Sequence, residues 1–495
     1  MRIPMIICIL LGLVACAAGQ VPASPTISMA PVQGTPQTRI PTELPTVPAT
    51  QPSASNTMAS GVLITLRRTI EDTSYFPPPP SSQRYRDETP LVDPATGQDV
   101  PGYPPFLAQT AVMSGDGKRA VGIESRGQSC EAVGGGSGCY ASADVLHLID
   151  LTAWHEVTST LSATGWVGPL VFSPDGTRLA LSLQEKRVST LMLLDAQTGQ
   201  VLNRRALSFR PSRIKYTSDG AQIAIYGQPP SSDPGMTQPD PPRVLWVDAA
   251  TLDPIWEQPL TNIVSGSWCL ENCQASHEEN VNQYWRPAFD FTPDGRKLYI
   301  AHADAEQLTS VDFYARTLRT VDVRAERSWW EQWFDPRGRV AEAKGITHGA
   351  YKSAVLSRDG QRLYVVGRAY AGTENLFGEP RDLQVVDVES GRVLASQKSE
   401  AESIVLSPDG AYLWLEAPGK SSLWTEVLDT DALTLVKRFE EGWHIAGTRR
   451  INGQPLVVAS QYLGQPNQMA VLDPHTYEVI HSWTTGGYAS WAAVP

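Results

Sequence analysis

The sequence predicts an all-β protein built from consecutive units of four antiparallel strands. Two turn motifs recur along most of the chain, and each is flanked by short apolar runs of strand length. The composition agrees with this fold class, because charged residues make up only 19% of the chain while it contains 14 Trp and 16 Tyr. Such a balance favours a rigid protein with aromatic packing over a disordered or long-helical one.

The first turn motif is clearest at Ser173-Pro174-Asp175-Gly176, between two runs of alternating apolar residues. Proline presets φ, and glycine accepts the positive φ that a tight reversal requires. The stretch 170–181 therefore predicts a β-hairpin with one buried face. Further copies occur at 113–117, 216–220, 291–295, 356–360 and 406–410, and Ile451-Asn452-Gly453 stands where a seventh would fall.

In the second motif a strand ends in Asp, a short turn follows and another strand leaves. Asp195 before a Thr-Gly turn and Asp387 before a Ser-Gly turn are clear examples. The aspartates of the first motif are separated by 59, 44, 75, 65 and 50 residues from Asp116 to Asp409. Four-stranded units at this spacing are typical of a β-propeller, whose blades bury their faces against their neighbours. A stack of β-sandwiches would need linkers, and none interrupts residues 107–485.

The two motifs together resemble the YVTN-type repeats of β-propellers and the related WD40-like repeats of TolB-like and quinoprotein-like domains. The resemblance rests on the Ser-Pro-Asp-Gly turn, on Leu298-Tyr299-Ile300 or Leu-Tyr-Val after it, and on the strand that ends in Asp. It covers nearly all of residues 107–485. The resemblance implies the propeller fold and no particular activity.

The two ends of the chain bear on the number of blades. Seven units lie wholly within the chain, while 61–69, 91–97 and 489–494 resemble further strands. These segments are expected to close the ring by combining strands from both ends, as propellers commonly do. The alternative is that they form an eighth, composite blade. We expect a seven-bladed propeller over residues 61–495.

The N-terminus predicts an exported protein. Arg2 precedes an apolar run over 6–15, which is typical of a signal peptide and too short for a spanning helix. Leu13-Val14-Ala15-Cys16 resembles the lipobox of bacterial lipoproteins. The resemblance implies that residues 1–15 are removed, that Cys16 is acylated, and that the protein lies in the bacterial cell envelope, lipid-anchored to the outer face of a membrane. The alternative is an ordinary cleavage site that uses the small residues on either side of Cys16.

Residues 16–60 are expected to form an extended tether between anchor and propeller. Of the forty residues from 21 to 60, twenty are Pro, Thr or Ser. Such a segment buries too little apolar surface to offset the entropy lost on ordering. We therefore expect the tether to hold a monomeric propeller body away from the membrane.

Charge and motifs exclude several classes of function. The net charge is −12, and Lys and Arg form no cluster larger than a short pair, so nucleic acid is not an expected partner. The sequence has no G-x-S-x-G elbow, no H-E-x-x-H, no phosphate loop and no dinucleotide fingerprint. No catalytic residue and no cofactor are therefore assigned.

The longest insertions fall on one face of the predicted propeller. First–second and third–fourth turns are short, whereas second–third loops and blade connectors hold the insertions 126–143, 228–242, 265–287, 324–352 and 368–381. In a four-stranded antiparallel blade these two sets lie at opposite ends. Long loops on a rigid scaffold commonly carry binding sites. We expect this long-loop face to bind, although neutral growth of surface loops is the alternative.

Four of the six cysteines fall on the long-loop face, in two local pairs. In an exported protein these predict the disulfides Cys130–Cys139 and Cys269–Cys273. A metal site formed by Cys269, Cys273 and His277 is the alternative, but structural zinc sites normally show a fourth ligand. We assign no metal.

Tryptophans cluster in two blade connectors of the same face. Trp329, Trp330 and Trp333 lie in one connector, and Trp268 and Trp285 lie in the preceding one. Exposed Trp suits sugar rings, apolar ligands or a protein interface, whereas the alternative is that these rings cap the propeller core. The sequence thus predicts a propeller that binds an unidentified protein or small molecule through the long-loop face. The alternative is a propeller enzyme, either a lactonase-like hydrolase with a channel metal or a quinoprotein-like dehydrogenase.

Overall fold

A computed structural model of the chain describes the segments that carry the propeller. The described residues are 64–71, 85–88, 91–92, 98–103, 109–133, 136–157, 165–185, 188–228, 240–271, 281–325, 347–371, 378–418, 423–439, 442–451, 454–461, 467–485 and 488–493. They belong to one compact unit, Asn56–Pro495. Its regular elements are all β-strands, and no helix in these segments is long and apolar enough to cross a membrane.

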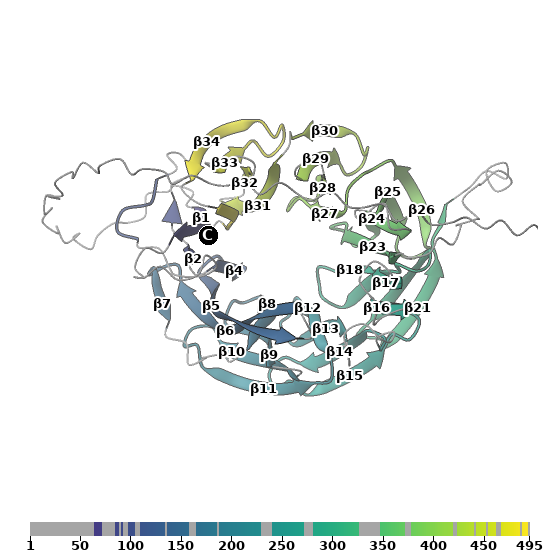
Figure 1. The fold of residues 1–495 in the computed structure, drawn as a ribbon, viewed down its shortest axis with the longest axis horizontal. Coiled ribbons are helices and arrows are strands. Elements are labelled where there is room, and N and C mark those ends of the chain that lie inside the picture. Colours follow the sequence, from purple (N-terminus) through teal and green to yellow (C-terminus); the bar gives the residue numbers. More distant parts are fainter. Residues whose placement is uncertain are drawn as a thin grey trace, which may run out of the picture. The chain divides into compact units, whose positions relative to one another are not determined.

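Seven consecutive blades of four antiparallel strands surround a central axis, which confirms the predicted fold (Figure 1). Blade 1 contains β4 (Gln109–Met113), β5 (Arg119–Val133), β6 (Gly136–Asp150) and β7 (His155–Val157). Blade 2 contains β8 (Trp166–Phe172), β9 (Arg178–Glu185), β10 (Val188–Asp195) and β11 (Val201–Leu207). Blade 3 contains β12 (Arg210–Tyr216), β13 (Gln222–Gln228), β14 (Arg243–Asp248) and β15 (Pro254–Pro259).

The remaining four blades repeat this order of strands. Blade 4 contains β18 (Ala288–Phe291), β19 (Lys297–Ala301), β20 (Gln307–Asp312) and β21 (Thr317–Asp322). Blade 5 contains β23 (Thr347–Leu356), β24 (Arg362–Ala371), β25 (Glu379–Asp387) and β26 (Arg392–Gln397). Blade 6 contains β27 (Ser403–Leu406), β28 (Tyr412–Pro418), β29 (Leu423–Asp429) and β30 (Leu435–Arg438). Blade 7 contains β31 (Trp443–Ile451), β32 (Gln454–Gln461), β33 (Asn467–Leu472) and β34 (Val479–Thr485).

A composite sheet from both ends of the chain stands between blade 7 and blade 1 (Figure 1). It combines β1 (Ile64–Glu71), β2 (Tyr85–Glu88) and β3 (Leu91–Val92) with the last strand, β35 (Tyr488–Ala493). Strand β1 pairs antiparallel with β35 from Thr65 opposite Ala493 to Thr69 opposite Tyr488. The two ends therefore combine in one sheet, which stands in addition to the seven regular blades, as in the composite arrangement that the sequence left open as the alternative.

In blades 1 to 6, whose first turns the structure describes, the turn is closed by its own side chains. In blade 2 the Ser173 hydroxyl donates a hydrogen bond to Asp175 Oδ1 at 2.5 Å, and the Thr177 N–H donates to the same oxygen at 3.0 Å. The Arg178 N–H in turn donates to Ser173 Oγ at 2.9 Å. Gly176 has φ of 69°, a conformation that glycine adopts readily. The recurring motif thus satisfies the polar groups of a tight turn within six residues.

The third–fourth turns use a single aspartate in the same way. The backbone N–H groups of Gln197 and Thr198 both donate to Asp195 Oδ1, at 2.9 and 2.7 Å. The two kinds of turn lie side by side in blades 1 to 6, and in blade 2, for example, the Ala196 N–H donates to the Thr177 carbonyl at 2.8 Å. The face that carries these turns is called the short-turn face below.

Apolar clusters fill the space between neighbouring blades. In the cluster between blades 2 and 3, the buried side chains of Leu191 and Leu193 pack with those of Ile214, Ile223 and Leu245. Each blade is therefore stabilised by both of its neighbours, as a propeller requires.

Two insertions form strands instead of the expected loops. Residues 126–143 extend β5 and β6 into one long hairpin, in which Cys130 lies opposite Cys139. The connector after blade 3 forms the hairpin of β16 (Gly266–Glu271) and β17 (Val281–Arg286), and β17 pairs in parallel with β23 of blade 5. A further strand, β22 (Arg324–Ala325), pairs in parallel with β26, so that blade 5 belongs to a seven-stranded sheet.

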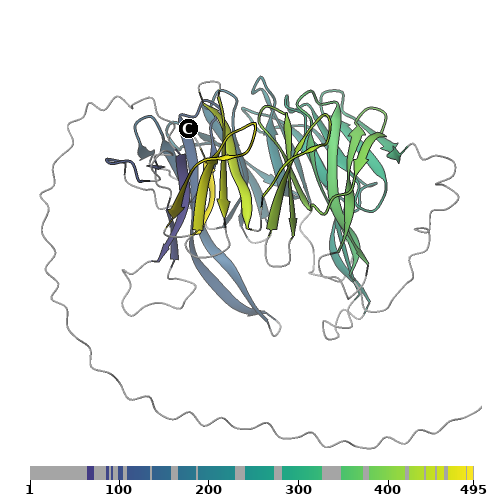
Figure 2. The ribbon, with the colours of Figure 1, turned by 90° about the horizontal axis from the view of Figure 1, so that it is seen from above.

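The extended strands support the predicted asymmetry between the two faces. Figure 2 shows the long β5–β6 hairpin and the long strands of blade 5 projecting from the same side of the ring. The short Asp-capped turns occupy the opposite ends of these blades. The long-loop face is therefore built partly from regular strands, because the extended ends of β5 and β6 pair with each other and β16 pairs with β17.

Candidate binding site

The parallel pairing of β17 with β23 brings a connector onto an inner strand of blade 5. Tyr284 of β17 lies opposite Gly349 of β23, and Gly349 lies opposite Tyr370 of β24. The glycine presents no side chain between the two tyrosines, and their rings meet edge to face with centroids 5.9 Å apart. Gly349 has φ of 156°, and a Cβ at this position would overlap the Tyr284 carbonyl oxygen. The meeting of the two rings therefore depends on glycine at this position.

A second row lies two residues further along the same three strands. Arg286 of β17 lies opposite Tyr351 of β23, and Tyr351 lies opposite Arg368 of β24. The guanidinium carbon of Arg286 is 5.0 Å from the centre of the Tyr351 ring, in a cation–π arrangement. Because side chains at i and i+2 of a strand share a face, both rows present their side chains on one side of the sheet.

Arg368 anchors this arrangement to the surrounding loops. Its side chain is 6% exposed, and its Nη1 donates to the Gly378 carbonyl at 3.0 Å. Its Nη2 donates to the carbonyl of Glu400 at 2.8 Å, in the connector to blade 6. Arg368 Nε also lies 3.4 Å from the carboxylate of Glu402. One buried guanidinium thus fixes two chain segments of the long-loop face.

Burial shifts the protonation equilibria of this cluster toward neutral forms. Loss of solvent raises the pKa of the Tyr351 and Tyr370 phenols, against the effect of the nearby arginines. Burial, together with the carboxylate of Glu402, raises the pKa of Glu416. Neutral phenols donate hydrogen bonds and are not activated as nucleophiles. The arrangement is therefore suited to recognition of a polar surface.

We call these seven residues the tyrosine–arginine cluster. Five of them share the side of the blade 5 sheet that faces blade 6, and the two glutamates lie in the connector to blade 6 and on β28: Tyr284, Arg286, Tyr351, Arg368, Tyr370, Glu402 and Glu416. Sequence reasoning did not identify them. Tyr284 and Arg286 lie in an insertion that the sequence analysis interpreted as a loop. No sequence pattern predicts that this segment pairs in parallel with β23.

The structure separates the two tryptophans of the first connector. Trp268 is 7% exposed, so its ring packs inside, which is the alternative interpretation that the sequence left open. Trp285 is partly exposed and donates from Nε1 to Gln283 Oε1 at 2.8 Å. Trp285 alternates with Tyr284 and Arg286 along β17 and therefore lies on the other side of the sheet.

Several predicted residues lie outside the described part of the chain. They are Cys16, Cys273, His277, Trp329, Trp330 and Trp333. The backbone of β16 places Cys269 opposite Asn282 of β17. Across the described residues, no group of three or more His, Cys, Asp or Glu side chains is arranged to hold a metal ion.

Comparisons with known proteins establish the fold and no family. No protein-family profile and no curated protein sequence matches the chain. Among solved structures, the dihydro-heme d1 dehydrogenase NirN in complex with DHE is 12% identical with a TM-score of 0.50, over 88% of this chain and 75% of that one. A eukaryotic initiation factor is 11% identical with a TM-score of 0.46, over 88% and 98% of the two chains. BamB from Moraxella catarrhalis is 11% identical with a TM-score of 0.40, over 72% and 87%. At these identities the chain is similar to such proteins in its β-propeller fold alone.

Proposed function

We propose that this protein is a lipid-anchored, extracytoplasmic β-propeller that binds a protein partner through its long-loop face. The observation that carries the proposal is the tyrosine–arginine cluster. Tyr, Arg and Trp are the residue types that dominate binding energy at protein interfaces. Here Tyr284 and Arg286 of β17 lie on one side of β23, which carries Tyr351. Tyr370 and Arg368 of β24 lie on its other side, and backbone carbonyls fix the Arg368 side chain.

The lipid anchor of the proposal rests on the sequence around Cys16. Acylation of this residue would make the mature protein partition into detergent, and Cys16→Ser should release it into the aqueous phase. A wild-type protein that stays in the aqueous phase, cleaved next to Ala17, would contradict the anchor and would not bear on the binding face.

Arg286→Ala and Tyr370→Ala test the binding face. Arg286 is exposed, so its removal should leave thermal stability nearly unchanged. Loss of an interface hot spot commonly costs about 2 kcal/mol, so partner capture from solubilised membranes should weaken at least about tenfold. The matched control is Arg296→Ala with Tyr314→Ala, a second Arg–Tyr pair, 5.7 Å apart, on the short-turn face. Equal capture by all of these variants would refute the proposed site.

The tryptophan connector provides a second test of the same face. Replacing Trp330 and Trp333 together by Ala should weaken capture at least about tenfold with little change in melting temperature, if these rings bind the partner. If they cap the core, the same change should lower stability by several kcal/mol, as buried aromatic deletions do. Differential scanning calorimetry separates the two outcomes.

A further inference from the structure

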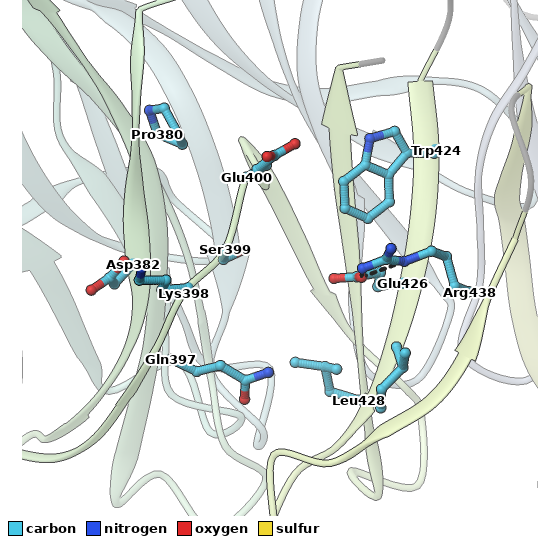
Figure 3. A pocket seen from close by; sticks show the side chains of 11 residues that line it. Pro380, Asp382, Gln397, Lys398, Ser399, Glu400, Trp424, Glu426, Leu428 and Arg438 are labelled. Carbon is cyan, nitrogen blue, oxygen red and sulfur yellow. Dashed lines mark hydrogen bonds and ion pairs between the residues drawn. The ribbon is translucent and has the colours of Figure 1, made fainter.

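A pocket of about 460 Å³ lies on the outer wall of the ring, between blades 5 and 6 (Figure 3). Its size falls within the range of small-molecule sites. One wall comes from the start of β25 and the connector between β26 and β27, and the other comes from β29 and β30. The lining residues that matter for its chemistry are Asp382, Gln397, Lys398, Glu400, Trp424 and Arg438.

On the blade 6 wall, the Trp424 ring faces the pocket and the Arg438 side chain packs against this ring. The guanidinium of Arg438 is 5.0 Å from the ring centre of Trp424. Arg438 also donates from Nε to Glu426 Oε1 at 2.7 Å, and its Nη2 donates to the same oxygen. This ion pair neutralises both charges and fixes the orientation of the guanidinium. The indole is therefore a preorganised surface for a flat, apolar face of a ligand.

The blade 5 wall carries polar groups opposite the indole. In Figure 3 the Glu400 side chain extends toward Trp424, and Asp382, Gln397 and Lys398 line the same wall. Among the described residues, neither Asp382 nor Glu400 has an ion-pair partner within 4.0 Å. The backbone of this wall is fixed by the buried Arg368, which holds the Glu400 carbonyl at 2.8 Å.

The mixture of charges selects against an ionic ligand. Besides the Arg438–Glu426 ion pair, the Asp382 and Glu400 carboxylates oppose an anion, and the Lys398 ammonium opposes a cation. Hydroxyl groups can donate to carboxylates and accept from an ammonium or amide, so they match both kinds of group in the wall. A pyranose ring combines such hydroxyls with an apolar C–H face that can stack on an indole. We propose that this pocket binds a neutral saccharide ring, with Trp424 as the stacking platform and Asp382 and Glu400 as hydroxyl acceptors.

The saccharide site lies on the outer wall, and its lining includes none of the seven residues of the tyrosine–arginine cluster. Titration calorimetry tests it with the full-length protein in a detergent that has no sugar headgroup. The neutral probes are maltotetraose, cellotetraose and chitotetraose, and the charged probes are spermidine and a sulfated heparin tetrasaccharide. At least one neutral probe should bind, and Trp424→Ala should weaken that probe at least about tenfold. The matched control is Trp166→Ala, which removes a ring that is 42% exposed and carries Arg210 at 4.2 Å, outside the pocket.

A second variant keeps the test valid if loss of the indole disturbs folding. Glu400→Gln keeps the size of the side chain and removes the charged acceptor, so it should weaken the same probe while the melting temperature stays constant. Binding of none of the neutral probes, binding of charged probes alone, or equal binding by wild type, Trp424→Ala and Glu400→Gln would each overturn the proposal. Partner capture by Trp424→Ala should equal that of wild type, which separates this result from a failure of the partner face.

Discussion

Two turn aspartates of the short-turn face and two largely buried side chains of the long-loop face are shifted toward opposite protonation states, charged and neutral respectively. On the short-turn face, the Ser173 hydroxyl and the Thr177 N–H hold the pKa of Asp175 below its usual 3.8, and Ser390 does the same for Asp387. On the long-loop face, burial raises the pKa of Glu416 and lowers that of Lys352, whose side chain is 7% exposed. Local hydrogen bonds thus stabilise the charged forms of Asp175 and Asp387, whereas burial favours the neutral forms of Glu416 and Lys352.

These two arrangements differ in their energetic cost. A turn aspartate with several local donors stabilises the fold without any contribution from distant residues. A buried lysine or glutamate is costly unless its surroundings compensate, and such groups cluster at functional sites more often than elsewhere. Lys352 has an ammonium 3.4 Å from the Ala305 carbonyl and 4.0 Å from Glu306. The comparison therefore supports the choice of the long-loop face as the binding face.

The largest expected effect comes from Gly349, the residue that lets β17 approach β23. In Gly349→Ala the new methyl group would overlap the Tyr284 carbonyl oxygen. We expect β17 to detach from blade 5, so that the rings of Tyr284 and Tyr370 separate and partner capture falls by more than about tenfold. Hydrogen exchange should show new exposure of the amides of 282–286 while the turns of the short-turn face stay protected. Unchanged protection in β17 would contradict the close approach at Gly349.

Two glycines of the short-turn face sharpen the comparison, because they share φ of 71° and differ in their surroundings. A Cβ at Gly295 would overlap the Tyr216 carbonyl oxygen of the neighbouring blade, whereas at Gly360 the nearest atoms are 3.9 Å away. Gly360→Ala should cost about 1 kcal/mol from backbone strain, and Gly295→Ala about 3 kcal/mol. Urea denaturation measures both variants. Equal costs would show that the blades do not meet closely at this turn.

The smallest expected effects test the opposite pKa shifts of Asp175 and Glu416. The pKa of Asp175 is lower in the folded state than in the unfolded chain, so its charge contributes stability above its unfolded pKa of about 3.8, and this contribution is lost as the pH falls. Asp175→Asn keeps the acceptor oxygen but should lower the melting temperature at pH 7, and the difference from wild type should shrink below pH 4.

Glu416→Gln should behave in the opposite way. The pKa of Glu416 is raised on folding, so its ionisation above the usual 4.5 reduces stability. The variant should therefore melt at a higher temperature than wild type at pH 7, with the difference vanishing in acid. Melting temperatures of both variants across pH 3–8 provide the measurement, and shifts of the same sign would break the comparison between the faces.

The sequence by itself determined the propeller, its blades and the side that carries the insertions. These features are predictable because each turn motif satisfies its own polar groups within a few residues, as Ser173, Asp175 and Arg178 show, and so leaves a local pattern in the chain. The combination of both chain ends was also predictable, since 61–69 and 489–494 resemble strands without partners of their own.

Which side chains come together on the long-loop face was decided only by the tertiary structure. The tyrosine–arginine cluster depends on a parallel pairing between a strand of a connector and a strand of blade 5, and parallel pairing leaves no turn between its partners in the sequence. The burial of Trp268, the position of Arg368 between two loops, and the pocket beside Trp424 depend in the same way on distant segments. Local hydrogen bonds can be inferred from spacing, whereas burial and charge compensation between blades arise only when the ring is assembled.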